Sequence, residues 1–481
     1  MTELLLAFDR TGGELTARLT RALRDAVRQG RPPAGGRLPA TRVLARDLGL
    51  ARGTVVEAYA QLVAEGYLVS IPGSGTRVAD GVAPAAPPVP PPATGHPVRY
   101  DLAPGTPDLS AFPRAAWQAA LRRALADTAH SGLGYGDPAG RPELRAALAA
   151  SLGRVRGAAA TGRQVIVVGG VAQGLALLVG QLRQHGHRTL AVEDPCSPGT
   201  LDLLRAHGIE PVGVPVDTDG LDVAALAATG SRAVLVTPAH QYPTGVVLAP
   251  GRRAALIAWA RVTGGLVVED DYDAEFRYDR EPVGCLQGLA PDHVVHLGSL
   301  SKTLAPGLRL GWAVLPDAWA DGFREAKRYA DLGCSVLDQL AFARLLADGG
   351  HDRHLRAVRA RYRSRRDALA EALARHLPDA AVRGVAAGLH LHLDLPDGCA
   401  EAEAVAAAAE RGVRVEPVTP MRLESEGAPA VVLGYAALPE RALAEAARLL
   451  GQAVTASCGR RPAGAGAPTG GRPRPPAGRR R

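Results

Sequence analysis

Lysine is almost absent from this sequence of 481 residues. Lys302 and Lys327 are the only two, and arginine supplies the rest of the 56 basic side chains. A composition so biased towards arginine would have replaced any lysine that only had to carry a charge. Arginine stays protonated in proteins, so it cannot act as a nucleophilic amine. A retained lysine is therefore a candidate for amine chemistry, and an ordinary surface lysine is the alternative.

Cysteine and long apolar runs are scarce as well. The five cysteines are scattered, odd in number and without C-x-x-C spacing, so we expect a reducing cytoplasm and no metal site. No apolar run reaches the roughly 18 residues of a membrane span, and early acidic residues argue against a signal peptide. With 47% hydrophobic and 22% charged residues, the composition is typical of a cytoplasmic globular protein.

The basic excess lies at the two ends of the chain. Residues 459–481 carry seven arginines and no acid, and residues 1–80 carry 11 arginines against eight acids. Since the whole chain has a net charge of +8, the part between these ends is slightly acidic. A basic end on a nearly neutral body indicates nucleic-acid binding.

Two changes in composition divide the chain. Residues 81–98 are so rich in proline that they predict an extended, semi-rigid linker. Residues 456–481 are rich in arginine and glycine, cannot build a core, and are predicted to be a disordered tail that is either solvated or attracted to the DNA backbone. A chain of this length needs more than one core. We therefore expect a small N-terminal domain over residues 1–80 and a large domain over residues 99–455.

The N-terminal domain shows the pattern of three helices followed by a β-hairpin. The helices are expected over residues 14–29, 40–48 and 52–65, and the strands over residues 66–69 and 76–78. In the third helix, the side chains expected to face the core are Val55, Val56, Tyr59 and Leu62. This order of elements is that of a winged helix-turn-helix, whose third helix enters the major groove of DNA.

From residue 99 on, short apolar runs alternate with helix-length stretches. The runs cover residues 165–168, 189–192, 233–236, 266–270 and 294–297. Runs of this length are typical of strands buried in a parallel sheet. Helices are expected between them, for example over residues 172–184 and 251–262. The alternation predicts an α/β domain whose ligand binds at the carboxyl ends of the strands.

Polar groups follow three of these strands. Glycines open a helix after the first run, where backbone N–H groups suit a phosphate. Asp270 ends another run, and Ser299, Lys302 and Arg309 follow the last. Together these groups suit pyridoxal 5′-phosphate (PLP): the lysine forms a Schiff base, the carboxylate holds the pyridinium proton, and hydroxyl and guanidinium hold the phosphate. Each group alone has an ordinary structural explanation, but their order and spacing are specific.

The N-terminal segment resembles the DNA-binding domain of the GntR family of bacterial regulators. The resemblance rests on R-L-P-A-T-R-V-L-A-R-D-L-G-L-A-R-G-T-V-V-E-A-Y, followed by G-S-G-T. It implies that Arg42 and Arg52 contact double-stranded operator DNA, with Thr54 at the helix start. The residues implied for the wing are Gly73, Ser74, Gly75 and Thr76. Ala51 departs from the pattern, because a capping Ser or Thr is usual there and contributes about 0.5–2 kcal/mol.

The larger domain resembles the fold-type I, PLP-dependent aminotransferases, and the whole of residues 15–455 resembles a MocR-type regulator. The matching motifs are Y-G-D-P-A-G-R-P-E-L-R, T-P-A-H-Q-Y-P-T-G, E-D-D-Y-D-A-E-F-R-Y and S-L-S-K-T-L-A-P-G-L-R. The resemblance implies an N-terminal winged helix-turn-helix, an α/β aminotransferase-like large domain and a small C-terminal α+β domain.

The same resemblance assigns roles to single residues. It implies that Lys302 is the Schiff-base lysine, that Asp270 pairs with the pyridine nitrogen, and that Tyr272 reaches the 3′-oxygen of PLP. The residues implied for the phosphate are Ser299, Arg309 and the backbone of Val171 and Ala172. Tyr135 would contact the cofactor of the partner subunit, which implies a domain-swapped homodimer with shared sites.

Two positions depart from the aminotransferase pattern. Ser197 stands where an aromatic ring usually stacks on the cofactor, and Val432 stands where an arginine usually binds the substrate carboxylate. Valine cannot replace a bidentate guanidinium clamp. Arg414 or Arg422 is an alternative clamp in the sequence.

These departures favour a sensor over a catalyst. We expect a transcription regulator that senses PLP, or an amine or amino acid that displaces Lys302, and that controls vitamin B6 or amino-compound metabolism. Residual transaminase activity is compatible with this reading. One alternative is an aminotransferase that keeps an attached DNA-binding domain. Another is a nucleic-acid-binding protein with an inactive enzyme-like scaffold.

Overall fold

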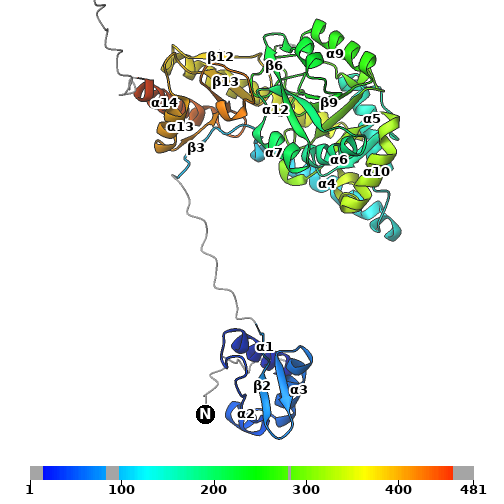
Figure 1. The fold of residues 1–481 in the computed structure, drawn as a ribbon, viewed down its shortest axis with the longest axis vertical. Helices are drawn as coiled ribbons and strands as arrows, with labels where there is room; N and C mark the ends of the chain where they lie inside the picture. The colour runs from blue at the N-terminus through cyan, green and yellow to red at the C-terminus, as the bar shows by residue number, and fades with distance from the viewer. Residues whose placement is uncertain (1–14, 83–96, 280–282, 459–481) are drawn as a thin grey trace, which may run out of the picture. The chain divides into compact units, whose positions relative to one another are not determined.

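The computed structural model describes residues 15–82, 97–279 and 283–458. Contacts divide the chain into two compact units, residues 1–94 and 95–481, each described here by itself (Figure 1). Most of the predicted linker and nearly all of the predicted tail lie outside the described residues. No helix among the described residues is long and apolar enough to cross a membrane.

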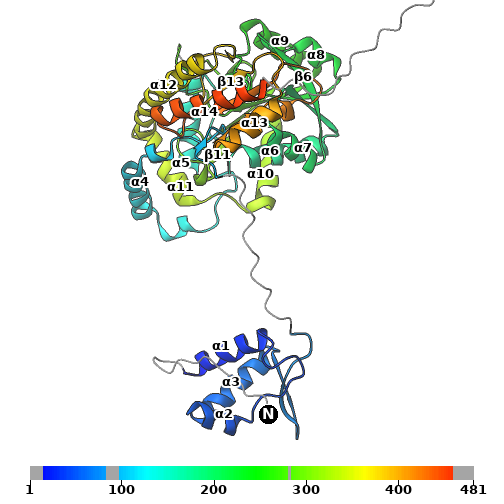
Figure 2. The ribbon, with the colours of Figure 1, turned by 90° about the vertical axis from the view of Figure 1, so that its left-hand side faces the viewer.

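The N-terminal unit is a winged helix-turn-helix, as the sequence predicts (Figure 2). Its elements are α1 (Leu15–Arg28), α2 (Thr41–Leu48), α3 (Arg52–Ala64), β1 (Leu68–Ile71) and β2 (Gly75–Val78). The two strands form an antiparallel hairpin in which Leu68 lies opposite Val78. One core joins the three helices and the hairpin, because the inner faces of α1, α2 and α3 are apolar.

The predicted core face of α3 is wrong at one residue. Val56 is 45% exposed, whereas Val55, Tyr59 and Leu62 are buried together with Ala58. Successive residues of a helix are about 100° apart, so Val55 and Val56 cannot both face a narrow core. At the start of α3, Ala51 makes no side-chain capping bond, in line with its departure from the family pattern.

The larger unit is built around an eight-stranded sheet with the strand order β4-β11-β10-β9-β8-β5-β6-β7. The strands are β4 (Val165–Val168), β5 (Thr189–Asp194), β6 (Glu210–Asp217), β7 (Gly220–Leu221), β8 (Ala233–Val236), β9 (Leu266–Asp271), β10 (Val294–Ser299) and β11 (Gly311–Val314). The five predicted strands are all present and mutually parallel. The sheet as a whole is mixed, because β11 turns back antiparallel between β10 and β4, and β7 turns back against β6.

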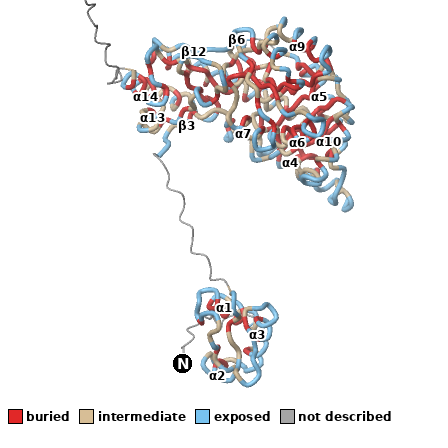
Figure 3. The backbone as a smooth tube through the Cα atoms, viewed as in Figure 1, coloured by how far each residue is buried: buried red, intermediate tan, exposed pale blue. Residues whose placement is uncertain are grey.

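Helices cover both faces of this sheet, so that its strands are buried on each side (Figure 3). Successive side chains of a strand point to opposite faces, and β4 shows the result. Ile166 and Val168 pack with α6 (Val171–Gln184), α7 (Pro198–Ala206) and α10 (Asp317–Asp331). Val165 and Val167 pack with α4 (Arg114–Asp127), α5 (Pro142–Arg156) and α11 (Val336–Ala347), and α9 (Pro250–Thr263) covers the same face farther along.

A smaller α+β lobe follows, as the resemblance implies. Its sheet has the order β12-β13-β16-β15, and its helices form a second core against it. The elements are β12 (Ala381–Arg383), β13 (His390–Asp394), β15 (Glu416–Pro417), β16 (Ala430–Gly434), α12 (Gly350–His376), α13 (Glu401–Glu410) and α14 (Glu440–Cys458). The start of the larger unit joins this lobe, because β3 (Tyr100–Asp101) pairs with β14 (Val413–Arg414).

The cysteines differ from the sequence-based expectation. Cys399, just before α13, and Cys458, the last residue of α14, form a disulfide, whereas Cys196, Cys285 and Cys334 are free. The scatter of the cysteines along the chain did not predict this pair, because the two residues are 59 positions apart and only the packing of α13 on α14 brings them together. Helix α14 also continues past the predicted end of the domain at residue 455.

Candidate cofactor site and DNA-binding surface

A cavity of about 370 Å³ lies at the carboxyl ends of the central strands. It brings together seven of the eight residues expected around the cofactor, namely Val171, Ala172, Asp270, Tyr272, Ser299, Lys302 and Arg309. They come from segments up to 138 positions apart in the chain, and the parallel strands carry them to one edge of the sheet. This is where α/β sheets bind their ligands.

One end of the cavity is suited to an anion. Helix α6 begins at Val171, and the N–H groups of its first turn have no partner within the helix. The guanidinium of Arg309 lies beside this turn: a Cβ on Gly170 would come within 3.1 Å of it, and Gly170 has a φ of 105° that favours glycine. Arg309 itself has a φ of 47°, a strained conformation for a residue with a side chain. The surrounding fold thus holds a strained arginine over a helix N-terminus.

The cavity is also lined by an unsatisfied carboxylate. Asp270 is the penultimate residue of β9, and its Oδ1 atom is buried without a hydrogen-bond partner among the described residues. Burial, reinforced by the neighbouring Asp271, raises the pKa of Asp270 to about 7. A cationic N–H group placed against this buried carboxyl group supplies the missing hydrogen bond and stabilises the charged carboxylate. The group therefore fits a protonated pyridine nitrogen.

The two lysines have different surroundings. Lys302 lies in the loop between β10 and β11, where its Nζ donates a hydrogen bond to the backbone oxygen of Gly105 at 2.6 Å. Burial lowers the pKa of Lys302, although Asp273 and Asp270 oppose the shift. Lys327 is fully buried in α10 and pairs with Asp331 at 2.6 Å, outside the cavity. Of the two lysines, both of which the structure describes, Lys302 is the one that lines the cavity.

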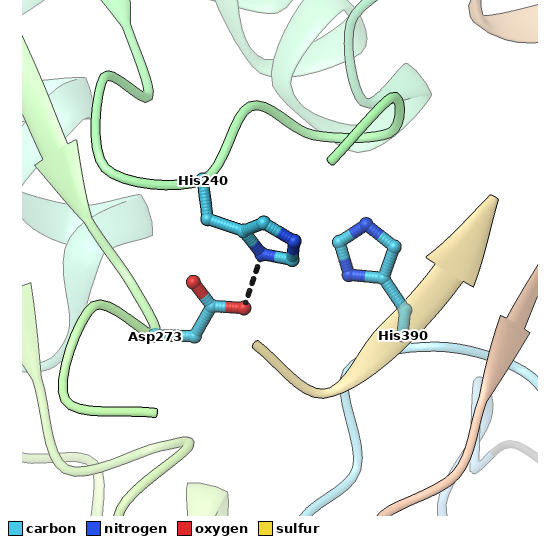
Figure 4. Close-up of side chains that lie close together, drawn as sticks. All are labelled: His240, Asp273 and His390. Carbon is cyan, nitrogen blue, oxygen red and sulfur yellow. Dashed lines mark hydrogen bonds and ion pairs between the residues drawn. The ribbon is translucent and has the colours of Figure 1, made fainter. Parts of the chain in front are cut away.

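A buried cluster that the sequence analysis missed lies behind Tyr272. His240 Nδ1 lies 3.0 Å from Asp273 Oδ2, and the hydroxyl of Tyr272 lies 3.2 Å from the same nitrogen. His390 faces His240 across the cluster, with 4.7 Å between the ring centres (Figure 4). His240 stands in the motif T-P-A-H-Q-Y-P-T-G and Asp273 in D-Y-D, but nothing in either motif predicts that the two side chains lie next to each other.

Tyr135 is the predicted cofactor residue that the fold does not bring to the cavity of its own chain. It follows the short helix His130–Leu133 and its side chain is 92% exposed. A tyrosine with so little contact in its own chain is available to a second molecule.

The two residues that depart from the aminotransferase pattern have different surroundings. Ser197 lines the cavity, and the rings that line it with Ser197 are those of Tyr242, Tyr272 and His390. Val432 is fully buried in the small lobe, packed with Val418, Met421 and Ala430.

Neither alternative clamp reaches the cavity. Arg414 is paired with Asp101 at 2.6 Å, and both are about half exposed. Arg422 donates to the backbone oxygen of Ala428 and lines a separate cavity of about 730 Å³ between the two lobes. Among the described residues, Arg309 is thus the only arginine that lines the cofactor-like cavity.

The residues expected to contact DNA lie at the surface of the N-terminal unit. Arg42 follows the first residue of α2, Arg52 is the first residue of α3, and both side chains are exposed. Thr54 is half-buried in the first turn of α3. The predicted wing residues 73–76 form the turn of the hairpin and the start of β2. The fold therefore presents all of them on the surfaces that a winged helix uses.

Comparison with known proteins gives the same division of the chain. Residues 15–78 match the profile of the gntR family of bacterial regulatory proteins, and residues 100–450 match that of aminotransferase class I and II. The pyridoxine biosynthesis transcriptional regulator PdxR of Corynebacterium glutamicum is 34% identical over 78% of this chain and 82% of its own. The "Probable rhizopine catabolism regulatory protein MocR" of Rhizobium meliloti is 32% identical over 90% and 92%.

Solved structures resemble the larger unit. The α-aminoadipate aminotransferase LysN of Thermus thermophilus, solved with N-(5′-phosphopyridoxyl)-L-leucine, is 28% identical with a TM-score of 0.68, covering 74% of this chain and 92% of its own. A kynurenine aminotransferase of Pyrococcus horikoshii is 26% identical with a TM-score of 0.69, covering 76% and 92%. The two profiles, the regulators related over most of the chain and the enzymes related to the larger unit all agree with the geometry. This chain belongs to the MocR-type transcriptional regulators, in which a GntR winged helix-turn-helix is joined to an aminotransferase-like domain.

Proposed function

We propose that this regulator binds PLP at Lys302 and that occupation of the site changes its binding to operator DNA. The observation that carries the proposal is the convergence of an amine, an unsatisfied carboxylate and an anion-binding helix end on one cavity. PLP supplies an aldehyde, which condenses with a lysine amine and releases water. A second primary amine can then displace the lysine from this linkage. PLP itself, or such an amine or amino acid, is then the signal.

Each residue of the cavity has one task in this proposal. The first turn of α6, at Val171 and Ala172, and the side chains of Ser299 and Arg309 hold the phosphate. Asp270 holds the pyridine proton, and Tyr272 donates to the 3′-oxygen. Lys302 supplies the amine, and burial favours its neutral, nucleophilic form by lowering its pKa.

The absent carboxylate clamp favours a sensor over an aminotransferase. Val432 is buried in the core of the small lobe. Arg414 pairs with Asp101, and Arg422 lines the separate cavity between the lobes. An amino acid in the cavity would lack the bidentate partner that orients its carboxylate for turnover. Sustained turnover with an amino acid and a 2-oxo acid would support the alternative, an aminotransferase with an attached DNA-binding domain.

We further propose a homodimer in the bacterial cytoplasm. The exposed Tyr135 supports it, because the resemblance to aminotransferases implies that this residue contacts the cofactor of a partner subunit. Vitamin B6 or amino-compound metabolism is the proposed target, in keeping with the relatives PdxR, named as a regulator of pyridoxine biosynthesis, and MocR, named as a regulator of rhizopine catabolism. A dimer also gives two DNA-binding units, which suits an operator with two half-sites.

The test is a titration of the full-length protein with PLP in the presence of the DNA upstream of its own gene. Binding is followed by fluorescence anisotropy, and the visible band of lysine-linked PLP is recorded in the same samples. We expect the DNA affinity to change over the PLP range in which the band appears. DNA binding that is indifferent to PLP, in protein that shows the band, would contradict the sensor function.

We expect Arg52→Gln to weaken operator binding by about tenfold or more, since an arginine contact with a base edge or phosphate contributes about 1–3 kcal/mol. The absorption band with PLP stays unchanged, because Arg52 lies in the other unit. Arg21→Gln, an equally exposed arginine on α1, is the matched control and keeps its operator affinity. Equal loss in both variants would contradict the placement of α3 in the major groove.

A further inference from the structure

Behind Tyr272 lies a hydrogen-bonded pair, His240 and Asp273, that no catalytic role yet explains (Figure 4). The N–H of His240 Nδ1 is shared between Asp273 Oδ2 at 3.0 Å and the Tyr272 hydroxyl at 3.2 Å. The Tyr272 O–H in turn donates to the backbone oxygen of His240 at 2.8 Å. The oxygen of Tyr272 is therefore fixed by two bonds to a single residue.

The fold is built to accommodate this pair. His240 and Asp273 are only 2% and 1% exposed. A Cβ on Gly388 would lie 2.2 Å from the ring of His240 and 2.4 Å from Asp273 Oδ2, so only glycine leaves room for the pair. The hydroxyls of Tyr278 and Tyr435 both donate to the backbone oxygen of Gly388, which holds this glycine in place.

The negative charge of the pair affects the pKa values of residues that line the cavity. Asp273 Oδ1 is buried without a hydrogen-bond partner among the described residues, so His240 is the only bonded partner that these residues offer the carboxylate. Of the neighbouring charges, Asp273 does most to oppose the lowering of the Lys302 pKa by burial. Burial, and then Asp273, also raise the pKa of Tyr272 well above its usual range. The negative charge of the pair thus reaches both groups that face the cofactor.

Resting on the proposed function, we propose that His240 and Asp273 are positioning residues that hold the oxygen of Tyr272 at the cofactor and set the proton affinity of the Lys302–PLP linkage. The other titratable groups that face this region are Glu193, Tyr242, Asp270, Glu275, Tyr278, His390, His392 and Tyr435. Burial, helped by neighbouring histidines, holds the pKa of His390 well below its usual range, so His390 is neutral. The charge of Asp273 is therefore offset only in part.

The Tyr272 proton can turn without moving the oxygen. In the structure the O–H points to the backbone oxygen of His240. A hydrogen bond to an oxygen anion is about twice as strong as one to a neutral carbonyl, so the O–H turns towards the 3′-oxygen when PLP is bound. The N–H of His240 keeps the phenol oxygen in position meanwhile. This donation withdraws charge from the 3′-oxygen and lowers the linkage pKa, whereas the Asp273 carboxylate raises it.

The experiment measures the linkage pKa from the pH dependence of the visible band in PLP-loaded, full-length protein. Asp273→Asn removes the charge but keeps the shape, and we expect the proton affinity of the linkage to fall about tenfold. His240→Gln removes the Nδ1 donor, leaving Asp273 unpaired and Tyr272 a weaker donor, and raises the linkage pKa. His240→Asn restores a donor near the Nδ1 position and returns the pKa to the wild-type value. Asp202→Asn, on the exposed side of α7, is the charge control and leaves the pKa unchanged.

The outcomes separate this inference from the proposed function. Wild-type protein without a visible band would contradict the proposed function itself. A band with the wild-type pKa in both Asp273→Asn and His240→Gln would overturn only the positioning role. His240, Asp273 and His390 could also hold a metal ion. The wild-type titration is therefore repeated with zinc and with a chelator. A linkage pKa that changes with either addition would overturn the assignment of His240 and Asp273 as a hydrogen-bonded pair. Should Asp273→Asn not fold, the two His240 variants still decide, because the linkage pKa is expected to rise in His240→Gln and to return to the wild-type value in His240→Asn.

Discussion

Lys302→Ala abolishes the visible absorption band that PLP gives with the wild-type protein, and with it the effect of PLP on operator binding. The physical reason is that the band belongs to PLP joined to a primary amine, and Lys302 is the only amine that lines the cavity among the described residues. Without the linkage, PLP is held only by its phosphate and ring contacts. The measurement is an absorption spectrum and an anisotropy titration on the same protein.

Two controls sharpen this result. Lys302→Arg keeps the positive charge but supplies no deprotonated amine, and it also loses the band. Lys327→Arg changes the only other lysine of the chain and keeps the band, because Lys327 pairs with Asp331 away from the cavity. A band that survives in Lys302→Ala would contradict the assignment, since the aldehyde would then be joined to another amine.

The second large effect is expected from Asp270→Asn. An asparagine cannot supply the charge-assisted hydrogen bond to a protonated pyridine nitrogen, which contributes about 1.5–3 kcal/mol, so PLP affinity falls by about tenfold to a hundredfold. Fluorescence quenching by PLP measures this affinity. Tyr329→Phe, at an exposed tyrosine of α10, is a control that leaves it unchanged.

The same substitution stabilises the protein without cofactor. Burial raises the pKa of Asp270 from its ordinary value of 3.8 to about 7, so the folded state binds more protons than the unfolded state between these values. By linkage, the wild-type free energy of unfolding therefore falls as the pH rises through this range, and asparagine does not titrate. The stability gained by Asp270→Asn grows from about pH 4 to about pH 7 and is constant above. Thermal unfolding at three pH values measures it, and a gain that is equal at all of them would contradict the raised pKa.

Much of the fold could be predicted because the sequence signals were local. Five apolar runs form strands β4, β5, β8, β9 and β10. A strand of a sheet that helices cover on both faces is apolar at successive positions, so a short apolar run is a sufficient signal for it. Strand β11 was missed, although it lies between β4 and β10. Its segment directly follows the lysine loop, and only pairing with two neighbours determines that it turns back antiparallel.

Some residues of the site could likewise be predicted from local sequence signals, and others could not. Asp270, Ser299 and Lys302 were found from the sequence because each stands at or just after the end of an apolar run, and parallel strands end at one edge. His240 and Asp273 were not found, because neither motif contains the other residue and their contact depends on the loop after β8 reaching the end of β9. Gly388, which leaves room for the pair, comes from the small lobe, more than 100 positions further along the chain.

By itself the sequence determined the chemistry of this protein: a lysine kept where arginine is the rule, a carboxylate and an arginine at strand ends, and a winged helix-turn-helix in front of them. The tertiary structure alone decided the surroundings of the two lysines: Lys302 lines the cavity and donates to the backbone oxygen of Gly105, whereas Lys327 is paired with Asp331 outside it. It also decided that Val432 is buried in the small lobe, that Arg414 pairs with Asp101 and that Arg422 lines a separate cavity. The reason is physical: residue type and spacing fix what a side chain can do, whereas burial and neighbours fix its proton affinity and its partners.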